Sequence, residues 1–402
     1  MSHTTVVIGG GQAGLAVSRE LVAAGVDHVV LERARVAEAW RRRWDSFTLV
    51  TPNWTLDLPG RAYAGDDPEG HVARDEIVAY LEAYAAGHAG EIQEGVQVDG
   101  LGPGGSAPFR LDTTVGPIEA ESVVVCTGAY QRPHRPGAAV AAPPGLLVID
   151  AAGYTNPGAL PDGDVLVVGS GQTGVQLAEE LVHSGRGVTL ACGRAPWAPR
   201  RLDGIDIVTW LTRAGFYDQP SSVLARPVDR LVANLQATGA NGGHDLHYRV
   251  LQTLGVRLTG HLAGIEGSRA FFADDLAESV AFGDARYADI RRILADRLPA
   301  QGVAAPAMPD PTPFRAEPVA EVDLRTFGAI ILTAGFRPDY TWVRFPVFDE
   351  LGFPVVRDDL STAVPGLSFC GVHFLRTRRS SLLFGVGADA AILARTIVAA
   401  RG

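Results

Sequence analysis

Two segments of the sequence, at 9–14 and 169–174, contain three glycines in the spacing GxGxxG. In such a turn the first glycine allows a tight reversal, the second lets a pyrophosphate approach the backbone, and the third lets a helix pack closely on a strand. The following helix presents free N–H groups to the phosphates. The residues are Gly9, Gly11, Gln12, Ala13 and Gly14 in the first turn and Gly169, Gly171, Gln172, Thr173 and Gly174 in the second. Both turns are therefore candidate dinucleotide-binding sites.

A residue that can recognise the ribose of a dinucleotide follows each turn. Glu32 lies 18 residues after Gly14, where a carboxylate accepts hydrogen bonds from ribose hydroxyls and repels a 2′-phosphate. Arg194 lies 20 residues after Gly174, where a guanidinium can pair with a 2′-phosphate through two hydrogen bonds. We therefore expect FAD or NAD at the first site and NADPH rather than NADH at the second. The alternative for Arg194 is a solvated surface arginine.

Each turn must be positioned by a strand before it and a helix after it. The β-branched apolar runs at 5–8 and 165–168 are typical of buried parallel strands. A helical pattern follows each turn, and further apolar runs at 28–31 and 188–192 complete two strand–helix–strand units. These patterns predict an α/β fold with two Rossmann-like dinucleotide-binding domains.

The composition argues against several classes of protein. With 402 residues, of which 47% are hydrophobic and 20% charged, the chain is expected to form a globular protein of two domains. Its net charge of −10 argues against a nucleic-acid binder. No run of about 18 apolar residues predicts a membrane span. The first residues show no charged leader or cleavage site, so no secretion signal is expected.

The cysteines and histidines do not form a recognisable redox or metal motif. Cys126, Cys192 and Cys370 form no CxxC pair, and each ends a short apolar run. This predicts buried, unreactive thiols and a reducing, cytoplasmic compartment. His244 and His247 have no companions at metal-ligand spacing, so we expect no bound metal.

Over essentially its whole length the sequence resembles the flavin-containing monooxygenase-like flavoproteins. Segment 40–60 resembles the part of that family that lies along the FAD, and 124–128 and 331–339 resemble its two crossing points between domains. Segments 366–371 and 385–390 resemble its C-terminal return to FAD. The resemblance implies FAD and NADPH as cofactors. The cofactor contacts implied outside the two turns are Glu32, Arg33, Trp40, Arg43, Trp44, Thr51, Thr127, Gly128, Arg194, Gly335, Gly371 and Gly387.

The resemblance also implies a discontinuous domain arrangement. Residues 1–160 and 321–402 would form the FAD domain, with the NADPH domain, 161–320, inserted between them. A charged helical pattern at 271–298 predicts extra helix in the inserted part. In such folds the last helix points its N-terminus at the flavin, where its dipole can stabilise an anionic reduced ring. The substrate pocket is expected in the cleft between the domains, over the flavin.

One segment, 145–154, departs from the family pattern. Asp150 stands where the family has a histidine, and the aromatic residue before the glycine is absent, whereas Tyr154 and 156–157 match. This segment corresponds to the hinge that leads into the NADPH domain. Its departure puts the coupling of NADPH to oxygen chemistry in doubt.

Several residues keep alternative interpretations. Trp40 and Trp44 could form one face of a core helix, and the basic run 41–43 could be a solvated helix end. Asn53 is the candidate for a hydrogen bond to the flavin or to a peroxide, and the alternative is a turn asparagine. The arginines of 376–379 could bind an anionic substrate group or the nicotinamide nucleotide's phosphate, or could belong to a solvated loop.

In the chemistry that the resemblance implies, NADPH gives a hydride to flavin N5, and the reduced flavin reacts with oxygen to form a C4a-hydroperoxide. Three functions remain open. The first is a monooxygenase that oxygenates a small organic molecule. The second, favoured by the altered hinge, is a flavin oxidase or dehydrogenase without oxygen insertion, and the third is a redox-sensing flavoprotein. The missing cysteine pair argues against a thiol–disulfide reductase, and no pattern indicates an oligomeric state.

Overall fold

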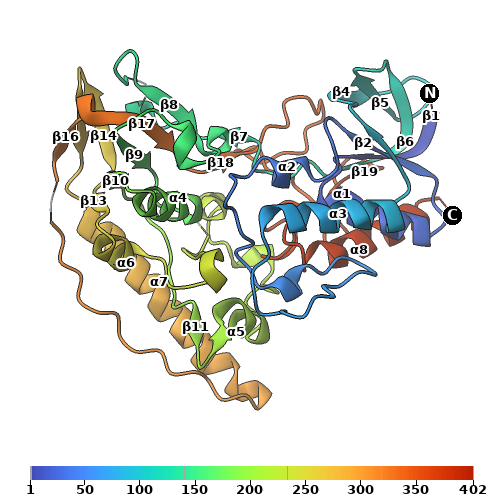
Figure 1. Ribbon diagram of the computed structural model, residues 1–402. Helices are drawn as coiled ribbons and strands as arrows, with labels where there is room; N and C mark the ends of the chain where they lie inside the picture. The colour runs from blue at the N-terminus through green and yellow to red at the C-terminus, as the bar shows by residue number, and fades with distance from the viewer. Residues whose placement is uncertain (1, 140, 233, 318, 402) are drawn as a thin grey trace.

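A computed structural model describes residues 2–139, 141–232, 234–317 and 319–401. The chain forms two lobes, each built around a sheet with parallel strands at its centre, and both termini lie on the first lobe (Figure 1). This arrangement confirms the predicted α/β fold with two Rossmann-like units. In both lobes the central strands are apolar and buried, as strands between helical layers must be.

The first lobe contains a seven-stranded sheet in the order β3-β2-β1-β6-β5-β4, with β19 paired to the end of β6. Its parallel strands are β1 (Ser2–Ile8), β2 (His28–Glu32), β3 (Glu91–Glu94), β6 (Ile118–Val125) and β19 (Leu367–Phe369), and its antiparallel strands are β4 (Val98–Pro103) and β5 (Phe109–Thr113). Its helices are α1 (Gln12–Ala23), α2 (Glu38–Arg41), α3 (Arg74–His88) and α8 (Val386–Ala399). Helix α1 packs against both α3 and α8.

The second lobe contains a five-stranded parallel sheet in the order β13-β10-β9-β17-β8. These strands are β8 (Leu147–Asp150), β9 (Asp164–Val168), β10 (Val188–Ala191), β13 (Arg257–Thr259) and β17 (Phe327–Leu332). The helices are α4 (Gln172–His183), α5 (Ile207–Arg213), α6 (Tyr248–Thr253) and α7 (Leu276–Arg297). The short strands are β11 (Arg201–Leu202), β12 (Ile205–Asp206), β14 (Leu262–Glu266), β15 (Arg269–Phe272) and β16 (Glu321–Asp323). Helix α7 is the extra helix predicted at 271–298, and it shares a separate hydrophobic core with α5.

The chain passes between the lobes twice at the same place. Strand β7 (Arg132–Pro133) on the outward passage pairs antiparallel with β18 (Phe336–Arg337) on the return. Strands β8 and β17 both belong to the second sheet, although they lie outside the predicted range 161–320. The predicted range of the second domain is therefore too narrow. Strand β17 pairs with β9 in the second sheet, as β6 pairs with β1 in the first. It completes the second sheet before the chain returns to the first lobe.

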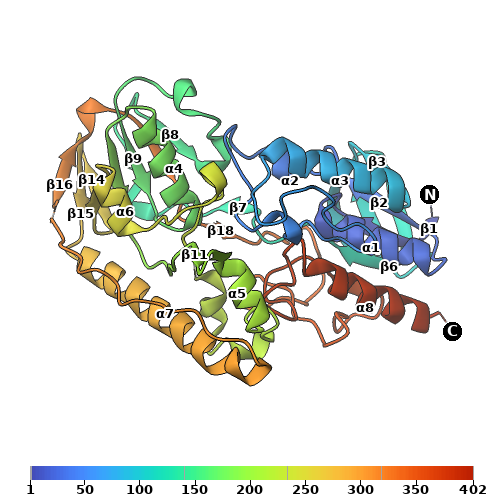
Figure 2. The same cartoon turned by 60° about the horizontal axis from the view of Figure 1, so that its bottom comes forward.

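A buried polar cluster at the N-terminus of α5 joins the two lobes. Figure 2 shows α5 of the second lobe on the side that faces α8 of the first. Arg200 Nη2 and Asp206 Oδ2 are 2.7 Å apart, and both side chains are almost completely buried. His71, from the first lobe, accepts a hydrogen bond from Arg200 Nη2 on Nε2 (3.0 Å) and donates one through Nδ1 to Leu49 O (3.0 Å). Burial and the neighbouring Arg200 cation lower the pKa of His71 to about 4. The imidazole is therefore neutral at pH 7.

We predict that His71→Gln weakens the pH dependence of stability. The unfolded chain binds a proton at this histidine near pH 6.5, whereas the folded chain resists protonation down to about pH 4. The free energy of unfolding must therefore fall as the pH is lowered through this window, by an amount on the order of 2 kcal/mol from His71. Denaturant unfolding midpoints at pH 7 and pH 4.5 should lie closer together in the variant than in the wild type. Equal pH dependence in both proteins would contradict the assignment.

Candidate functional site

The first glycine turn is packed tightly on one side and open on the other. Gly9 has a φ of 112°, and a Cβ on it would lie 2.8 Å from Cys126 O. A Cβ on Gly14 would overlap the carbonyl oxygen of Gly9. By contrast, no atom of the described residues lies within 4 Å of a Cβ built on Gly11, and α1 begins directly after Gly11 without a side-chain cap. A pyrophosphate needs this combination of exposed N–H groups and a clear approach.

Two hydrogen bonds from backbone N–H groups hold the Glu32 carboxylate beside this turn. Its Oε2 accepts from Gly10 N (2.6 Å), and its Oε1 accepts from Ala34 N (3.0 Å). The carboxylate is buried at the carboxyl end of β2, which is where a ribose lies when a dinucleotide binds a Rossmann unit. Arg33, the next residue, is exposed.

The return segment contacts the first turn directly. Gln12 Nε2 donates to Ser381 O (3.2 Å), and Gln12 Oε1 accepts from Trp40 Nε1 (3.1 Å). A Cβ on Gly371 would overlap the side chain of Ala13, so only glycine allows the chain to pass here. These contacts bring three segments that resemble the FAD-binding parts of the family to one place.

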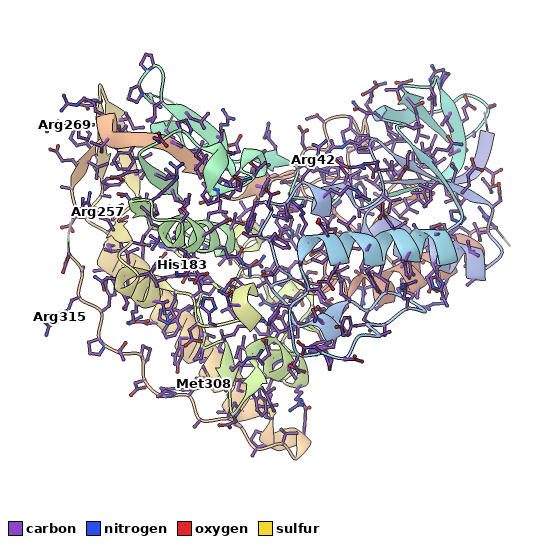
Figure 3. The ribbon with its side chains drawn as sticks, viewed as in Figure 1. Arg42, His183, Arg257, Arg269, Met308 and Arg315 are labelled. Atoms are coloured by element: carbon purple, nitrogen blue, oxygen red, sulfur yellow. The ribbon has the colours of Figure 1, made fainter. Side chains whose placement is uncertain are left out.

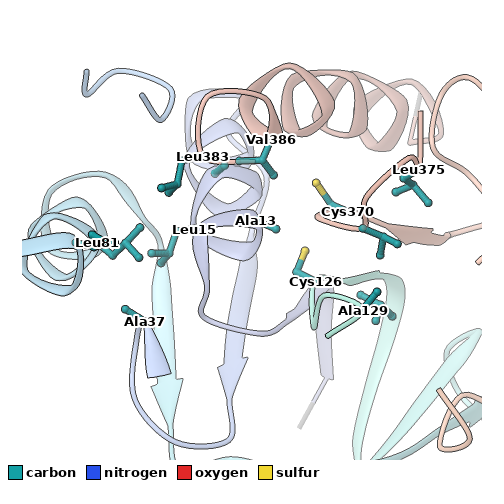
Figure 4. Packing of buried hydrophobic residues seen from close by; sticks show 14 of the residues in the cluster. Ala13, Leu15, Ala37, Leu81, Cys126, Ala129, Cys370, Leu375, Leu383 and Val386 are labelled. Atoms are coloured by element: carbon teal, nitrogen blue, oxygen red, sulfur yellow. The ribbon is translucent and has the colours of Figure 1, made fainter. Parts of the chain in front are cut away.

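The sheet also places two cysteines side by side, which their sequence separation did not predict. Cys126 follows β6 and Cys370 follows β19, and both lie close to Ala13 (Figure 4). Cys370 and Cys192 are buried free thiols, as is Cys126, which confirms the predicted burial. A hydrogen bond with Cys126, together with burial, raises the pKa of Cys370. The thiolate, the reactive form of cysteine, is therefore disfavoured at Cys370.

Arg43 is a half-buried cation without a described anionic partner. Burial lowers its pKa, and its Nε has no hydrogen-bond partner among the described residues. Tyr130 lies near Arg43, and 51% of its surface is exposed. Because a buried charge needs a partner, Arg43 together with the open turn and the fixed Glu32 fits the anionic cofactor FAD.

Helix α8 begins close to the first lobe's loops. A Cβ on Gly387, in its first turn, would lie 2.7 Å from Pro59 Cγ. Asp389, in the same turn, is fully buried and accepts a hydrogen bond from Arg376 Nε (2.8 Å). Burial raises the pKa of Asp389. Asp389 was not among the predicted residues, because only the tertiary structure brings Arg376 to it.

The other two arginines of this segment contact the chain that follows α5. Arg379 pairs with Asp218 (2.7 Å). Arg378 lies between the rings of Phe216 and Phe374, 4.1 Å and 4.7 Å from their centroids, and burial lowers its pKa to about 10. None of the described carboxylates forms an ion pair with Arg378. The solvated-loop interpretation of 376–379 is therefore wrong.

The second glycine turn has the same construction as the first. Gly169 has a φ of 105°, and a Cβ on it would lie 2.8 Å from Thr333 O. Thr333 Oγ1 donates to Gly169 O (2.6 Å), which closes the turn against the end of β17. Helix α4 begins after Gly171 without a side-chain cap, and Gln172 Nε2 donates to Leu235 O (3.0 Å).

Arg194 is exposed after β10 and makes no hydrogen bond or ion pair with the residues that the structure describes. It is therefore available to a ligand. Gln236 contacts the second glycine turn: it is buried, and its Nε2 donates to Ser170 O (2.8 Å). Sequence patterns gave no signal for Gln236, which lies in an irregular segment.

Asn53 has a structural environment. Its Oδ1 accepts from Val72 N (2.6 Å), and its Nδ2 donates to Asp67 O (2.9 Å), so the amide holds the loop between these residues. Thr51 Oγ1 is hydrogen-bonded to Thr55 Oγ1 (2.6 Å). This geometry favours the structural interpretation of Asn53, and the catalytic role expected for it gains no support.

The tryptophans do not share a helix face. Helix α2 ends at Arg41, so Trp40 belongs to it and Trp44 lies beyond it. Trp44 is buried and packs edge-on against Phe47, with ring centroids 5.0 Å apart. The core-helix interpretation is therefore wrong, although Trp44 does belong to the core.

Residues of the crossing segments hold the two passages together. Thr127 Oγ1 accepts from Gln131 Nε2 (2.9 Å), and Tyr340 OH donates to Gly128 O (2.7 Å). Gly335 O accepts from His134 N (2.9 Å).

The altered hinge residue has a clear partner. Asp150 ends β8 and forms a two-pronged ion pair with Arg135, whose Nη2 is 2.6 Å from Asp150 Oδ2. The carboxylate therefore fastens the crossing segment to the second sheet.

Within the described ranges, no group of three or more His, Cys, Asp or Glu side chains is placed to hold a metal ion. The described helices include none with the length and apolar character needed to cross a membrane.

We predict that Gly11→Ala lowers FAD affinity without unfolding the protein. The added methyl meets no described atom, but it occupies the side from which the pyrophosphate approaches. Losing one hydrogen bond to a charged group corresponds to about a tenfold or greater loss of affinity. FAD titration followed by flavin fluorescence should show this loss, with an unchanged melting temperature of the apoprotein. Gly87→Ala, at another unobstructed glycine in α3, is the matched control, and equal FAD affinity in all three proteins would contradict the prediction.

Comparison with known sequences agrees with this geometry. Residues 6–212 match the family model described as pyridine nucleotide-disulphide oxidoreductase. An uncharacterised CzcO-like oxidoreductase of Geobacillus kaustophilus is 30% identical over 397 residues, which cover 98% of this chain and 97% of that protein. The indole-3-pyruvate monooxygenase YUCCA4 of Oryza sativa subsp. japonica is 29% identical over 230 residues, about half (52%) of each chain.

Among solved structures, a mutant flavin monooxygenase from Stenotrophomonas maltophilia has the same fold. Its TM-score is 0.72 at 21% identity, with 100% of this chain and 99% of that chain covered. The family match covers more than half of the sequence, and the CzcO-like relative covers nearly all of it. The chain therefore belongs to the pyridine nucleotide-disulphide oxidoreductase family, and it is an oxidoreductase that uses a flavin and a pyridine nucleotide.

Proposed function

We propose that the protein is an FAD-dependent monooxygenase that consumes NADPH and molecular oxygen and transfers one oxygen atom to a small organic molecule. The observation that carries the proposal is the pair of uncapped glycine turns, one with a fixed carboxylate and the other followed by an unpaired arginine. The thiols of Cys126 and Cys370 are both buried, and thiolate formation is disfavoured at Cys370, which does not suit a thiol–disulfide reductase. The buried free thiols of this protein also support a reducing, cytoplasmic compartment.

The chain's own residues have distinct roles in this proposal. Glu32 binds the ribose of FAD, and Arg43 balances the negative charge of its phosphates. Arg194 pairs with the 2′-phosphate of NADPH. The N-terminus of α8 lies in the return segment, where its dipole favours negative charge on a reduced flavin. When bound, FAD accepts a hydride from NADPH and passes the electrons to oxygen.

The substrate in this proposal carries an anionic group. Arg378 is a half-buried guanidinium without a described carboxylate partner; its Nη2 donates to Gln219 Oε1 (3.1 Å), and two phenyl rings lie against it. An anion would supply the charge that burial demands, and the rings suit an apolar body attached to it. The relatives named indole-3-pyruvate monooxygenases, which match about half of the chain, act by their names on such a carboxylate.

Isotope labelling distinguishes the candidate functions. With NADPH and ¹⁸O₂, a panel of small thioethers, amines and 2-oxo acids should contain at least one compound that acquires one ¹⁸O atom. In its presence, hydrogen peroxide release should fall below NADPH consumption. Peroxide release equal to NADPH consumption with every compound would favour an oxidase and overturn the proposal. An FAD-containing protein that oxidises no NADPH would favour a redox-sensing role.

We predict that Arg194→Ala raises the KM for NADPH about tenfold or more and changes the KM for NADH less than about twofold. Arginine forms charge-assisted bonds that only the 2′-phosphate can accept, so NADH loses nothing when the side chain is removed. Arg257→Ala is the matched control, because Arg257 is also an exposed arginine of the second lobe but lies at the start of β13 (Figure 3). Equal increases in both KM values would remove the 2′-phosphate role from Arg194.

A further inference from the structure

A histidine lies beside the ribose-reading position of the second unit. Strands β10 and β13 are parallel neighbours, with Ala191 opposite Thr259. The second residue after each strand therefore lies at the same edge of the sheet. These residues are Gly193 after β10 and His261 after β13. Arg194, the proposed 2′-phosphate ligand, is the next residue after Gly193. Ligands of Rossmann units bind at this carboxyl edge.

Gly193 leaves room for the imidazole of His261. A Cβ on Gly193 would lie 3.4 Å from His261 Nε2 and 3.9 Å from Cδ2, so the edge of the ring that carries Nε2 lies against this glycine. The side chain of His261 is 54% exposed, which leaves it accessible to a ligand. No described residue forms a hydrogen bond with Nε2, and this nitrogen lies beside Gly193, the residue before Arg194.

Asp275 fixes both the backbone and the ring of His261. Its Oδ1 accepts from His261 N (2.9 Å), and its Oδ2 is hydrogen-bonded to His261 Nδ1. The ring therefore cannot turn without losing its carboxylate partner. A carboxylate behind an imidazole sets which nitrogen faces forward, as it does for histidines that bind metals or reacting groups.

We propose that His261 is a second ligand of the 2′-phosphate of NADPH and that Asp275 is its positioning residue. A protonated imidazole donates from both nitrogens, so one ring can join a carboxylate to a phosphate oxygen. Arg194 supplies two donors in a plane, and His261 supplies a third from the adjacent strand end. The inference rests on the proposed use of NADPH. It assigns the preference for NADPH over NADH to residues that follow two strands, β10 and β13, instead of β10 alone.

The test measures ligand binding without turnover. Adenosine 2′,5′-bisphosphate and adenosine 5′-monophosphate differ only in the 2′-phosphate, and titration calorimetry of the FAD-loaded protein at low ionic strength gives both affinities. His261→Ala should weaken binding of the bisphosphate about tenfold, as expected for a hydrogen bond to a charged group, and should leave binding of the monophosphate unchanged. Asp275→Asn should weaken the bisphosphate by a smaller factor. His183→Gln, at an exposed histidine at the end of α4, should change neither affinity (Figure 3).

The outcomes separate this inference from the proposal beneath it. A wild-type protein that binds both nucleotides equally well would overturn the NADPH assignment and the role of His261 with it. A wild type that prefers the bisphosphate, together with a His261→Ala variant that keeps the full preference, would overturn only the role of His261. Equal losses for both nucleotides would also overturn that role, because they would indicate an effect on the adenosine. His261→Gln, which preserves bulk, must lose the same preference as His261→Ala.

Discussion

The position of each cofactor turn depends on one contact between a glycine and the end of a neighbouring strand. Gly9 lies against Cys126 O after β6, and Gly169 lies against Thr333 O after β17. A side chain at either glycine would push the strand end away, and the third glycine of each turn must fit under the first. Helices α1 and α4 are therefore held with their N-termini at the carboxyl edges of the two sheets. The strands that back the turns, β6 and β17, are also those from which the chain enters its two crossings, so the crossings are positioned by the cofactor turns.

The charges follow a second common rule. Arg43, Arg194 and Arg378 are among the arginines that have no carboxylate partner in the described residues, whereas Arg135, Arg200 and Arg376 are examples of arginines that do. Burial lowers the pKa of Arg43 and Arg378, which is the cost of a cation without a partner. Anionic cofactors and substrates would supply the missing charge. Binding to the folded state alone would then stabilise the fold, as linkage requires.

The sequence predicted the parts of the structure that depend on local pattern. Turn spacing and apolar runs located both strand–helix–strand units, and the crossing segments lie where the resemblance placed them. Asn53 shows where prediction from local pattern fails. Its hydrogen bonds reach residues of a loop, and no local sequence pattern predicts where that loop lies. The pair His71–Arg200 was missed for the same reason: its members lie far apart in sequence and meet only after the two lobes have assembled.

The order of the elements along the chain has a consequence for synthesis on the ribosome. The second sheet is built from one continuous stretch that ends with β17, so it can be completed while the C-terminal part is still being made. The first sheet lacks β19, and α1 lacks the packing of α8, until the last residues emerge. Gly371, which lies against Ala13, is among the last contacts to form. A nascent chain stalled before this point would carry a complete second sheet and an unfinished flavin site.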